Sequence, residues 1–275
     1  MLDALLYPDR VAVIGASRTP GKVGHDILAN LIAGGFGGEV VPVNPGAAEI
    51  LGRSSYPNLA AYGKPVDLGI IAVPQAAVLG AVQDLAKAQA KAVVVVTAGF
   101  KEIGPAGAEA EQKLAEFCAA RRIRLLGPNC LGLINTEHRM NASFAGRMPS
   151  RGSISVLSQS GALATAILDM AAGRQLGLAK VVSIGNKADI TEVDLLLALA
   201  RDEQTKVIVG YLEDISSGDE FIKAAEEAST AKPVVLFKAG TTEAGLKAAS
   251  SHTGVLAGVD IAYGAAFKRS GVIRP

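Results

Sequence analysis

Short apolar runs alternate with helical segments along most of this chain, and this alternation restricts its fold more than any other feature. In the first half, runs with the composition of buried strands alternate with segments that have apolar residues at helical spacing. The expected strands are residues 10–14, 40–43, 68–73, 92–96 and 124–126, and the expected helices are residues 25–33, 76–88 and 105–121. Strands that alternate with helices form βαβ units around a parallel sheet. We therefore predict a Rossmann-like domain, whose ligands bind beyond the carboxyl ends of the strands.

The alternation of expected strands and helices stops between residues 135 and 152, where polar residues, proline and glycine are frequent, and it resumes after residue 152. The second series has expected strands at residues 153–157, 179–184, 206–212 and 233–237, and expected helices at residues 161–176, 192–200, 219–228 and 259–268. The sequence therefore predicts an α/β protein with two doubly wound domains, at residues 1–135 and 150–275.

Composition narrows the class of protein. The 275 residues include 31 glycines, which suit tight strand-to-helix turns, and carry a formal net charge of +1. So small a charge argues against a binding surface for nucleic acid or anionic membrane. No apolar run approaches the roughly 18 residues of a transmembrane helix, and the N-terminus lacks the pattern of a signal peptide. Two cysteines without metal spacing suggest a reducing compartment. We expect a soluble cytoplasmic protein without a metal site of its own.

The turn at residues 15–24 follows the first expected strand and is related to the dinucleotide-binding fingerprint. Ser17 takes the place of the second glycine, which alters how the backbone can approach a pyrophosphate. The second strand ends at Asn44 rather than at an acid that would hold a ribose hydroxyl, so a plain NAD site is disfavoured. Ser17, Arg18 and Lys22 instead offer a hydroxyl and two cations to phosphates. The turn alone leaves two interpretations open, a nucleotide-like ligand and an ordinary strand–helix connection.

A second turn, Ser158-Gln-Ser-Gly161, lies between an expected strand and an expected helix. The first N–H groups of a helix and the positive end of its dipole bind anions. Ser158 and Ser160 add hydroxyl donors to such a site. Plain N-capping of the helix by serine explains the same residues, and locally it is the simpler interpretation.

His252 is one of three histidines and lies in a stretch of small residues, 238–260, that follows the last expected strand. Nothing bulky shields an imidazole there, and a histidine can carry a group covalently as a nucleophile. Glu213 follows the preceding expected strand, and its carboxylate could bond the imidazole and fix its tautomer. The alternatives are a surface histidine in a loop and an exposed loop acid.

Taken together, these segments resemble the NDP-forming acyl-CoA synthetases, the superfamily of succinyl-CoA synthetase. The resemblance is to the α-subunit, or CoA-binding half, most of all in the branch of the ADP-forming acetyl-CoA synthetases. The similar stretches cover nearly the whole chain in the expected order: Val13-Ile-Gly-Ala-Ser17, Leu126-Gly-Pro-Asn-Cys-Leu-Gly132, Leu157-Ser-Gln-Ser-Gly-Ala-Leu163, Ser183-Ile-Gly-Asn-Lys-Ala-Asp189, Tyr211-Leu-Glu213, Lys238-Ala-Gly240 and Ser250-Ser-His-Thr-Gly254. The resemblance implies a Rossmann-like CoA-binding domain followed by a flavodoxin-like CoA-ligase domain.

The family resemblance also implies a reaction: acyl-CoA + NDP + phosphate ⇌ carboxylate + CoA + NTP, through an acyl phosphate and a phosphohistidine. His252 matches the histidine that takes the phosphoryl group, and Glu213 matches the glutamate that orients it. The second turn, with Ser158, Ser160 and Gly161, matches the helix start that cradles the phosphate.

Coenzyme A should lie over the strand ends of the first domain, on the same resemblance. The loop that contains Asn129 and Cys130 should lie near the thioester. The positions that match the CoA-binding loops are Gly15, Ser17, Arg18, Thr19, Lys22, Asn44, Pro45, Val73, Pro74, Thr97, Ala98 and Gly99.

Substrates and partners follow from departures and gaps in the pattern. Succinate-using relatives carry a tyrosine where this chain has Thr165 or its small neighbours, so we expect a monocarboxylate such as acetate, or a larger acyl group. The chain has no phosphate-loop motif and no evident acid cluster for Mg²⁺. We therefore expect ATP or ADP with Mg²⁺ to bind an ATP-grasp β-subunit or a fused ATP-grasp region, in a hetero-oligomer. The rival functions are a CoA-binding regulatory or acyltransferase-associated module without ligase activity, and an NAD-dependent oxidoreductase.

Overall fold

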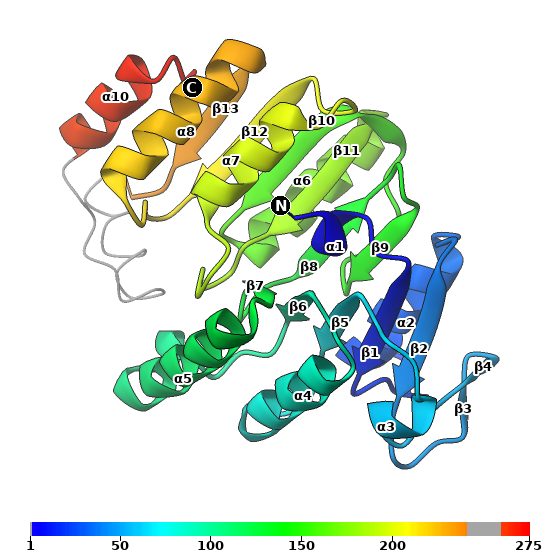
Figure 1. Cartoon of the computed structure of the whole chain (residues 1–275). Coiled ribbons are helices and arrows are strands. Elements are labelled where there is room, and N and C mark those ends of the chain that lie inside the picture. The colour runs from blue at the N-terminus through cyan, green and yellow to red at the C-terminus, as the bar shows by residue number, and fades with distance from the viewer. Residues whose placement is uncertain (1, 241–259) are drawn as a thin grey trace. The chain divides into compact units, whose positions relative to one another are not determined.

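The structure is a computed structural model that describes residues 2–240 and 260–275. The chain forms two compact units (Figure 1). Unit 1 comprises Met1–Met148 together with Asn186–Asp189, and unit 2 comprises Pro149–Gly185 together with Ile190–Pro275. A short segment of the second half of the sequence is therefore part of unit 1.

A five-stranded parallel sheet forms the centre of unit 1. The strands β5 and β6 are buried along their whole length, as is typical where helices cover both faces of a parallel sheet. In the register of the sheet, Ile14 of β1 lies beside Val43 of β2 and Ile71 of β5, so the carboxyl ends of these strands meet at one edge. In spatial order the strands are β2 (Glu39–Val43), β1 (Arg10–Ile14), β5 (Leu68–Ile71), β6 (Ala92–Val95) and β7 (Arg124–Leu126).

Helices cover both faces of this sheet. The helices of unit 1 are α1 (Asp3–Leu6), α2 (Val23–Ala33), α3 (Leu59–Tyr62), α4 (Gln75–Lys87) and α5 (Pro105–Arg121), with a 3-10 turn, η1 (Lys101–Ile103). Figure 1 shows α4 and α5 on one face and α2 on the other. Val78, Leu85 and Leu114 of α4 and α5 pack in one buried cluster with strand residues such as Val93. The helix α5 begins at Pro105, a residue whose fixed φ suits the first helical position.

Two antiparallel hairpins in unit 1 depart from the predicted pattern. They are β3 (Glu49–Ile50) with β4 (Arg53–Ser54), and β8 (Gly132–Asn135) with β9 (Met140–Ser143). The turn and second strand of the hairpin of β8 and β9 lie within residues 135–152, which we expected to be irregular. Its buried polar residues are hydrogen-bonded: Ser143 Oγ donates to Asn141 Oδ1 within the hairpin at 2.6 Å, and Asn135 Nδ2 donates to Leu6 O of α1 at 2.8 Å. These buried polar side chains hide the apolar alternation by which a strand is recognised.

Unit 2 is also doubly wound. Its parallel strands follow the order β13–β12–β10–β11. Because β11 and β12 lie on opposite sides of β10, the order matches the flavodoxin-like arrangement. Both units therefore confirm the predicted α/β fold class. The strands are β10 (Arg151–Ser158), β11 (Leu178–Ser183), β12 (Val207–Leu212) and β13 (Val234–Lys238).

The helices of unit 2 are α6 (Gly161–Gly173), α7 (Glu192–Arg201), α8 (Gly218–Ala231) and α10 (Asp260–Arg269). Figure 1 shows α7 and α8 side by side on one face of the sheet and α6 on the other. The helix α10 packs on α8 through Phe221 and Phe267, whose ring centroids are 5.7 Å apart. The expected helix 161–176 ends at Gly173, and the chain turns soon afterwards, where Gln175 has a φ of 56°.

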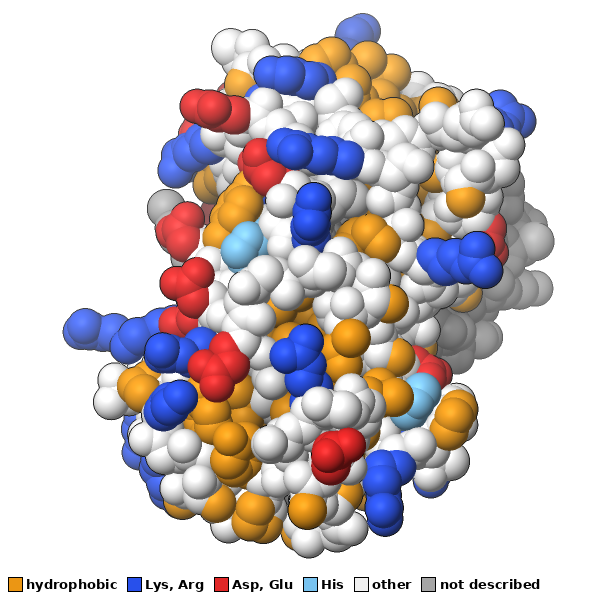
Figure 2. All heavy atoms as spheres, turned by 90° about the vertical axis from the view of Figure 1, so that its right-hand side faces the viewer, with side chains coloured by type: hydrophobic (Ala, Val, Ile, Leu, Met, Phe, Trp, Pro, Cys, Tyr) orange, Lys and Arg blue, Asp and Glu red, His pale blue; other side chains and the backbone are white. Residues whose placement is uncertain are grey.

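No helix in the described ranges, 2–240 and 260–275, is both long enough and apolar enough to span a membrane. Basic and acidic side chains are interspersed with apolar ones on the face that Figure 2 shows, without a large area of a single charge.

Candidate functional site

The predicted CoA-binding residues of unit 1 come together at the carboxyl edge of its sheet. The turn after β1, the loops after β2 and β5, and the loop after β6 carry all twelve of them. The neighbours of β1 are β2 and β5, which the chain reaches in opposite directions across the sheet. Such a switch in direction opens a crevice outside the strand ends, where doubly wound proteins bind their ligands.

Close packing at two glycines shapes the turn after β1. Gly15 has a φ of 88°, and a Cβ atom there would lie 2.4 Å from the carbonyl oxygen of Ala72. A Cβ atom on Gly24, in the first turn of α2, would lie 2.0 Å from the carbonyl oxygen of Gly15. A larger residue at Gly24 would push α2 away from the turn after β1, and one at Gly15 would collide with the backbone that follows β5. The two glycines thus bring the N-terminus of α2 against the sheet edge, as in dinucleotide-binding turns.

Cationic side chains surround this helix start. Arg18, Thr19 and Lys22 are exposed, and Lys22 is the N-cap residue of α2 without a side-chain capping hydrogen bond. Ser17 Oγ accepts a hydrogen bond from the backbone N–H of Thr19 at 3.1 Å, so the serine also shapes the turn in which it lies. The turn therefore offers two cations and a helix N-terminus, a combination that attracts phosphate groups.

An acid also touches this turn. Asp26 Oδ1 accepts the backbone N–H of Gly21 at 3.2 Å and lies 2.9 Å from His25 Nδ1. Sequence reasoning did not single out either side chain, although both directly follow the turn.

Hydrogen bonds join the loops of this edge to one another. Asn44 Nδ2 donates to Ala16 O at 2.6 Å, and Thr97 Oγ1 donates to Val73 O at 2.7 Å. The backbone N–H of Asn129 donates to Thr97 O at 3.0 Å. The Asn44 amide therefore braces the first turn, and the Thr97 hydroxyl braces the loop after β5.

Glu102 occupies backbone donors beside the predicted site. Its Oε1 atom accepts the N–H of Gly99 at 2.5 Å and of Phe100 at 3.2 Å. Burial acts to raise the pKa of Glu102, but hydrogen bonds from Asn186, Gly99 and Phe100 outweigh it and lower the pKa. Glu102 therefore stays ionised, and the backbone N–H of Gly99, one of the predicted CoA-binding residues, is bound to this carboxylate.

Asn186 belongs to unit 1 and lies in a network of polar side chains. Its Nδ2 atom donates to Glu102 Oε2 and to Glu111 Oε2, both at 2.7 Å. Its Oδ1 atom accepts from Asn129 Nδ2 at 3.3 Å, and its backbone N–H donates to Pro128 O at 2.9 Å. This network holds the loop of residues 127–130, which the resemblance places near the thioester.

Cys130 of that loop is buried, and its Sγ atom lies 3.4 Å from Val95 O. Burial raises the pKa of the Cys130 thiol to about 12. The thiolate is the reactive form of cysteine, so Cys130 is a packing residue and offers no nucleophile at neutral pH.

In unit 2 the predicted phosphate-binding turn and the predicted acid lie on neighbouring strands. The turn follows β10, and Glu213 follows β12, whose residue Tyr211 is in register with Ser158. The strands β11 and β12 flank β10, so this is the point where the strand order of unit 2 reverses.

Two serines build the turn at the start of α6. Ser158 is fully buried; its hydroxyl donates to Ser160 O at 2.7 Å and accepts the Ser160 N–H at 3.2 Å. Ser160 is the N-cap of α6, and its Oγ atom accepts the N–H of Leu163 at 3.3 Å. Ser158 therefore holds the turn in place, while Ser160 and Gly161 lie at the helix N-terminus, where an anion would bind.

Gln159, between the two serines, reaches across to the loop after β12. Its Oε1 atom accepts the backbone N–H groups of Glu213 at 2.8 Å and of Asp214 at 3.2 Å, and its Nε2 atom donates to Asp214 Oδ1. Sequence reasoning passed over this residue. Its position inside the Ser-x-Ser-Gly turn was the available signal.

His252 lies outside the described residues, as does the stretch 241–259 around it. The described chain ends β13 at Lys238 and resumes with α10 at Asp260. Among the residues that the structure does describe, no group of three or more His, Cys, Asp or Glu side chains could hold a metal ion.

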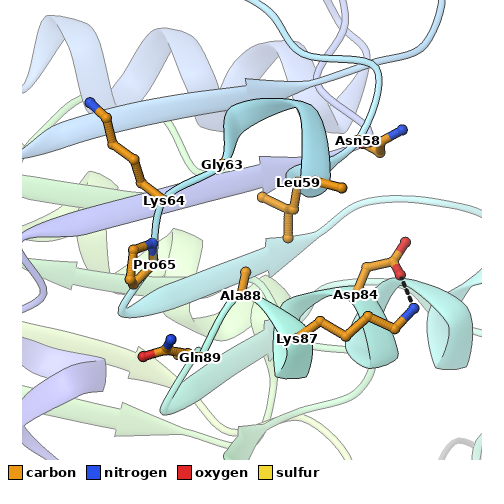
Figure 3. Close-up of a pocket in the computed structure, with 10 residues that line it drawn as sticks. Asn58, Leu59, Gly63, Lys64, Pro65, Asp84, Lys87, Ala88 and Gln89 are labelled. Atoms are coloured by element: carbon orange, nitrogen blue, oxygen red, sulfur yellow. Dashed lines mark hydrogen bonds and ion pairs between the residues drawn. The ribbon is translucent and has the colours of Figure 1, made fainter.

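A pocket of about 510 Å³ lies elsewhere in unit 1, beside α3 and the C-terminal end of α4 (Figure 3). This place is near the start of β5, at the opposite edge of the sheet from the predicted CoA-binding loops. None of the predicted site residues lines it. Its lining consists of Asn58, Leu59, Ala60, Gly63, Lys64, Pro65, Asp84, Lys87, Ala88 and Gln89.

Comparison with known proteins gives the class of this protein. Residues 9–136 match the family model described as CoA binding domain, and residues 151–275 match the one described as succinyl-CoA ligase like flavodoxin domain. The chain thus has a CoA-binding domain followed by a ligase-type flavodoxin-like domain.

Similar proteins point to one family. The acetate–CoA ligase (ADP-forming) of Methanocaldococcus jannaschii is 46% identical over 99% of this chain and 38% of its own length. The α-subunit of acetate–CoA ligase (ADP-forming) I of Pyrococcus furiosus is 42% identical over 99% of this chain and 60% of its own length. The structure also matches that of the dinucleotide-forming acetyl-coenzyme A synthetase 1 from Ca. Korarchaeum cryptofilum with phosphate and ADP. The TM-score is 0.96 at 42% identity, over 100% of this chain and 59% of the other.

This chain belongs to the NDP-forming acyl-CoA synthetase superfamily, where it corresponds to the CoA-binding, α-type part of the ADP-forming enzymes. It spans 38% to 60% of the length of these two relatives.

Proposed function

We propose that this chain is the α-type part of an ADP-forming acyl-CoA synthetase, which binds coenzyme A on unit 1 and carries a phosphoryl group on His252. The overall reaction is acyl-CoA + ADP + phosphate ⇌ carboxylate + CoA + ATP. The observation that carries the proposal is the switch point of unit 2, where the start of α6 and Glu213 meet on neighbouring strands. A phosphate site beside an orienting acid suits phosphoryl transfer to a histidine.

The chemistry has two steps on this chain. A phosphate oxygen attacks the thioester carbonyl carbon, the C–S bond breaks, and CoA leaves as a thiolate that takes up a proton. The imidazole of His252 then attacks the phosphorus of the acyl phosphate, the P–O bond breaks, and the carboxylate leaves. Glu213 orients the imidazole, while Ser160, Gly161 and the N-terminus of α6 stabilise the phosphoryl oxygens.

Unit 1 supplies the CoA site in this proposal. Exposed Arg18 and Lys22, the uncapped start of α2 and the braced loops after β2, β5 and β6 support it. We assign CoA binding to residues 1–135 and the phosphohistidine to residues 150–275. Asn129 lies beside the thioester, held by Asn186, and Cys130 supports that loop from inside.

The nucleotide site lies on a partner in this proposal. ATP or ADP with Mg²⁺ binds an ATP-grasp β-subunit or a fused ATP-grasp region, and His252 transfers the phosphoryl group to ADP there. The partial coverage of the relatives supports such a partner. We further propose a monocarboxylate such as acetate as substrate, because the side chain of Thr165 is small and bonds the Gly161 carbonyl at 3.1 Å. The assembly works in the cytoplasm.

The test supplies the purified chain with acetyl-CoA and ³²P-labelled phosphate. We expect label that is labile in acid and stable in base, as a phosphoramidate is, and none in a His252→Ala variant. His138→Gln is the matched control, because His138 is bound to Pro8 O in unit 1 and should not affect labelling. Label that persists without His252 would overturn the assignment. A chain that binds CoA but takes up no label, even with the ATP-grasp partner and ATP, would be a CoA-binding module without ligase activity.

A further inference from the structure

The side chain of Gln159 links the two strand ends at the switch point of unit 2. The backbone N–H of Gln159 donates to Tyr211 O at 3.0 Å and extends the ladder between β10 and β12 beyond the last strand residue. Its amide then spans to the two residues that follow β12. The residue is only partly buried, and yet both ends of its amide are hydrogen-bonded to protein atoms.

The amide oxygen fixes the backbone direction after β12. Oε1 accepts the N–H groups of Glu213 and Asp214, at 2.8 Å and 3.2 Å. Two consecutive peptide groups are thereby tied to β10. These bonds fix the backbone from which the Glu213 side chain extends.

The amide nitrogen of Gln159 binds the carboxylate of only one of the two adjacent acids, Glu213 and Asp214. Nε2 donates to Asp214 Oδ1, so the carboxylate of Asp214 is drawn to Gln159. The same glutamine binds Glu213 only through its backbone. The two neighbouring acids thus have distinct roles. The Asp214 carboxylate is bound to the Gln159 amide, whereas Glu213 is bound to that amide only through its backbone N–H.

We propose that Gln159 is a positioning residue, which holds Glu213 in the orientation needed for phosphoryl transfer by clamping the backbone after β12. This inference rests on the proposed function of Glu213. Small displacements of a reacting or orienting group cost large factors in rate, up to about 10²-fold for an error near 1 Å.

The test changes the donor and then the acceptor of the hydrogen bond between the Gln159 amide and the Asp214 carboxylate. Gln159→Glu is nearly isosteric, but it places a carboxylate against Asp214 Oδ1, where two negative charges cannot both be accommodated without cost. We expect the rate of phosphorylation from acetyl-CoA and phosphate to fall by about 10- to 100-fold. The KM for acetyl-CoA should remain within about twofold, because the proposed CoA site is in unit 1.

Rescue separates positioning from simple damage to the fold. In the double variant Gln159→Glu with Asp214→Asn, the new Asn amide donates to the new Glu carboxylate, and the hydrogen bond is restored with reversed polarity. We expect most of the lost rate to return. The single Gln159→Glu variant should also gain rate as the pH is lowered, since one shared proton restores a donor. Gln112→Glu is the matched control, because Gln112 Nε2 donates to Glu116 Oε1 at 2.9 Å on the exposed side of α5.

A second measurement tests, without catalysis, the hydrogen bonds from the backbone N–H groups of Glu213 and Asp214 to Gln159. Amide exchange of Glu213 and Asp214, followed by NMR, should speed up by about tenfold or more in Gln159→Leu, because their acceptor is gone. If wild-type chain takes up no label, the proposed function fails, and exchange still reports on the clamp. The inference is overturned if Gln159→Glu phosphorylates like wild type, if the double variant stays as slow as the single one, or if these amides exchange equally fast in wild type and Gln159→Leu.

Discussion

In both units the candidate site lies at the carboxyl edge of the sheet, where the strand order reverses, but different chemical groups form the two edges. In unit 1 the edge is formed by glycine turns, backbone groups and exposed cations, and its polar side chains mostly brace neighbouring loops. In unit 2 the edge is formed by polar side chains that bond within the turn after β10 and across to the backbone of Glu213 after β12. A surface for a long, charged ligand needs shape and charge, whereas a group-transfer site needs a side chain held in one orientation.

The largest effect should come from the acid in unit 2. Glu213→Gln should slow phosphorylation from acetyl-CoA and phosphate by about 10²–10⁴-fold, because the imidazole loses its ionised orienting acceptor. The affinity for CoA, measured by calorimetry, should not change. Glu220→Gln, at an exposed acid in the first turn of α8, serves as the control. If Glu213→Gln weakened CoA binding by as large a factor as it slowed phosphorylation, the two edges would not be separate sites.

The next effect tests shape in unit 1. Gly15→Ala and Gly21→Ala both place Ala at positive φ, of 88° and 80°, at a strain of about 1–3 kcal/mol each. Only Gly15→Ala also drives a Cβ atom into Ala72 O, whereas nothing lies within 4 Å at Gly21. Overlap in packed structure costs about 1–3 kcal/mol more. Urea unfolding should therefore rank Gly15→Ala below Gly21→Ala, and only the former should also lose CoA affinity. Equal stability of the two variants would contradict the proposed close packing.

Charge on the first turn should matter less than shape. Arg18→Gln and Lys22→Gln should each weaken CoA binding by about 0.3–1 kcal/mol, because both side chains are exposed and solvent screens them. The loss should shrink as salt is added. Lys113→Gln, on the exposed side of α5, should leave CoA binding unchanged. Losses that do not depend on salt would point to direct packing rather than to charge.

The smallest effect concerns the thiol at the edge of unit 1. With the pKa of Cys130 raised to about 12, only about one thiol in 10⁴ is ionised at pH 8. Iodoacetamide should therefore leave the native chain unmodified and fully able to accept phosphate, and should label the thiol only after unfolding. Rapid labelling of Cys130 in the native chain would show that unit 1 also presents a nucleophile.

Most of the fold could be predicted because buried parallel strands have continuous apolar sequences. The two hairpins of unit 1 are exceptions. In the hairpin of β8 and β9, the buried side chains of Asn141 and Ser143 bond each other and interrupt the apolar pattern. Its pairing depends on contacts that no local window of sequence contains. The same limit applies to Asn186–Asp189, which lies far along the sequence and yet folds with unit 1.

For the candidate site, the sequence locates the proposed residues at strand ends but does not reveal the side chains that hold them in place. Gly15, Ser160 and Glu213 stand at strand ends, where the alternation itself marks a ligand edge. Gln159 and Asn186 act through partners 54 and 84 residues away, such as Glu213 and Glu102, and nothing local reveals those bonds. The protein partners of the Asn44 amide and of the Gly99 N–H were not predicted, for the same reason.

The division of labour between the two edges can be measured directly by hydrogen–deuterium exchange, with either CoA or phosphate added to the wild-type chain. We expect CoA to slow exchange in residues 15–24, 44–46 and 97–99 of unit 1 and to leave residues 158–163 of unit 2 unchanged. Phosphate should do the reverse, and slow exchange at the start of α6. Protection of residues 158–163 by CoA, with none in the turn after β1, would show that CoA does not bind at the carboxyl edge of unit 1.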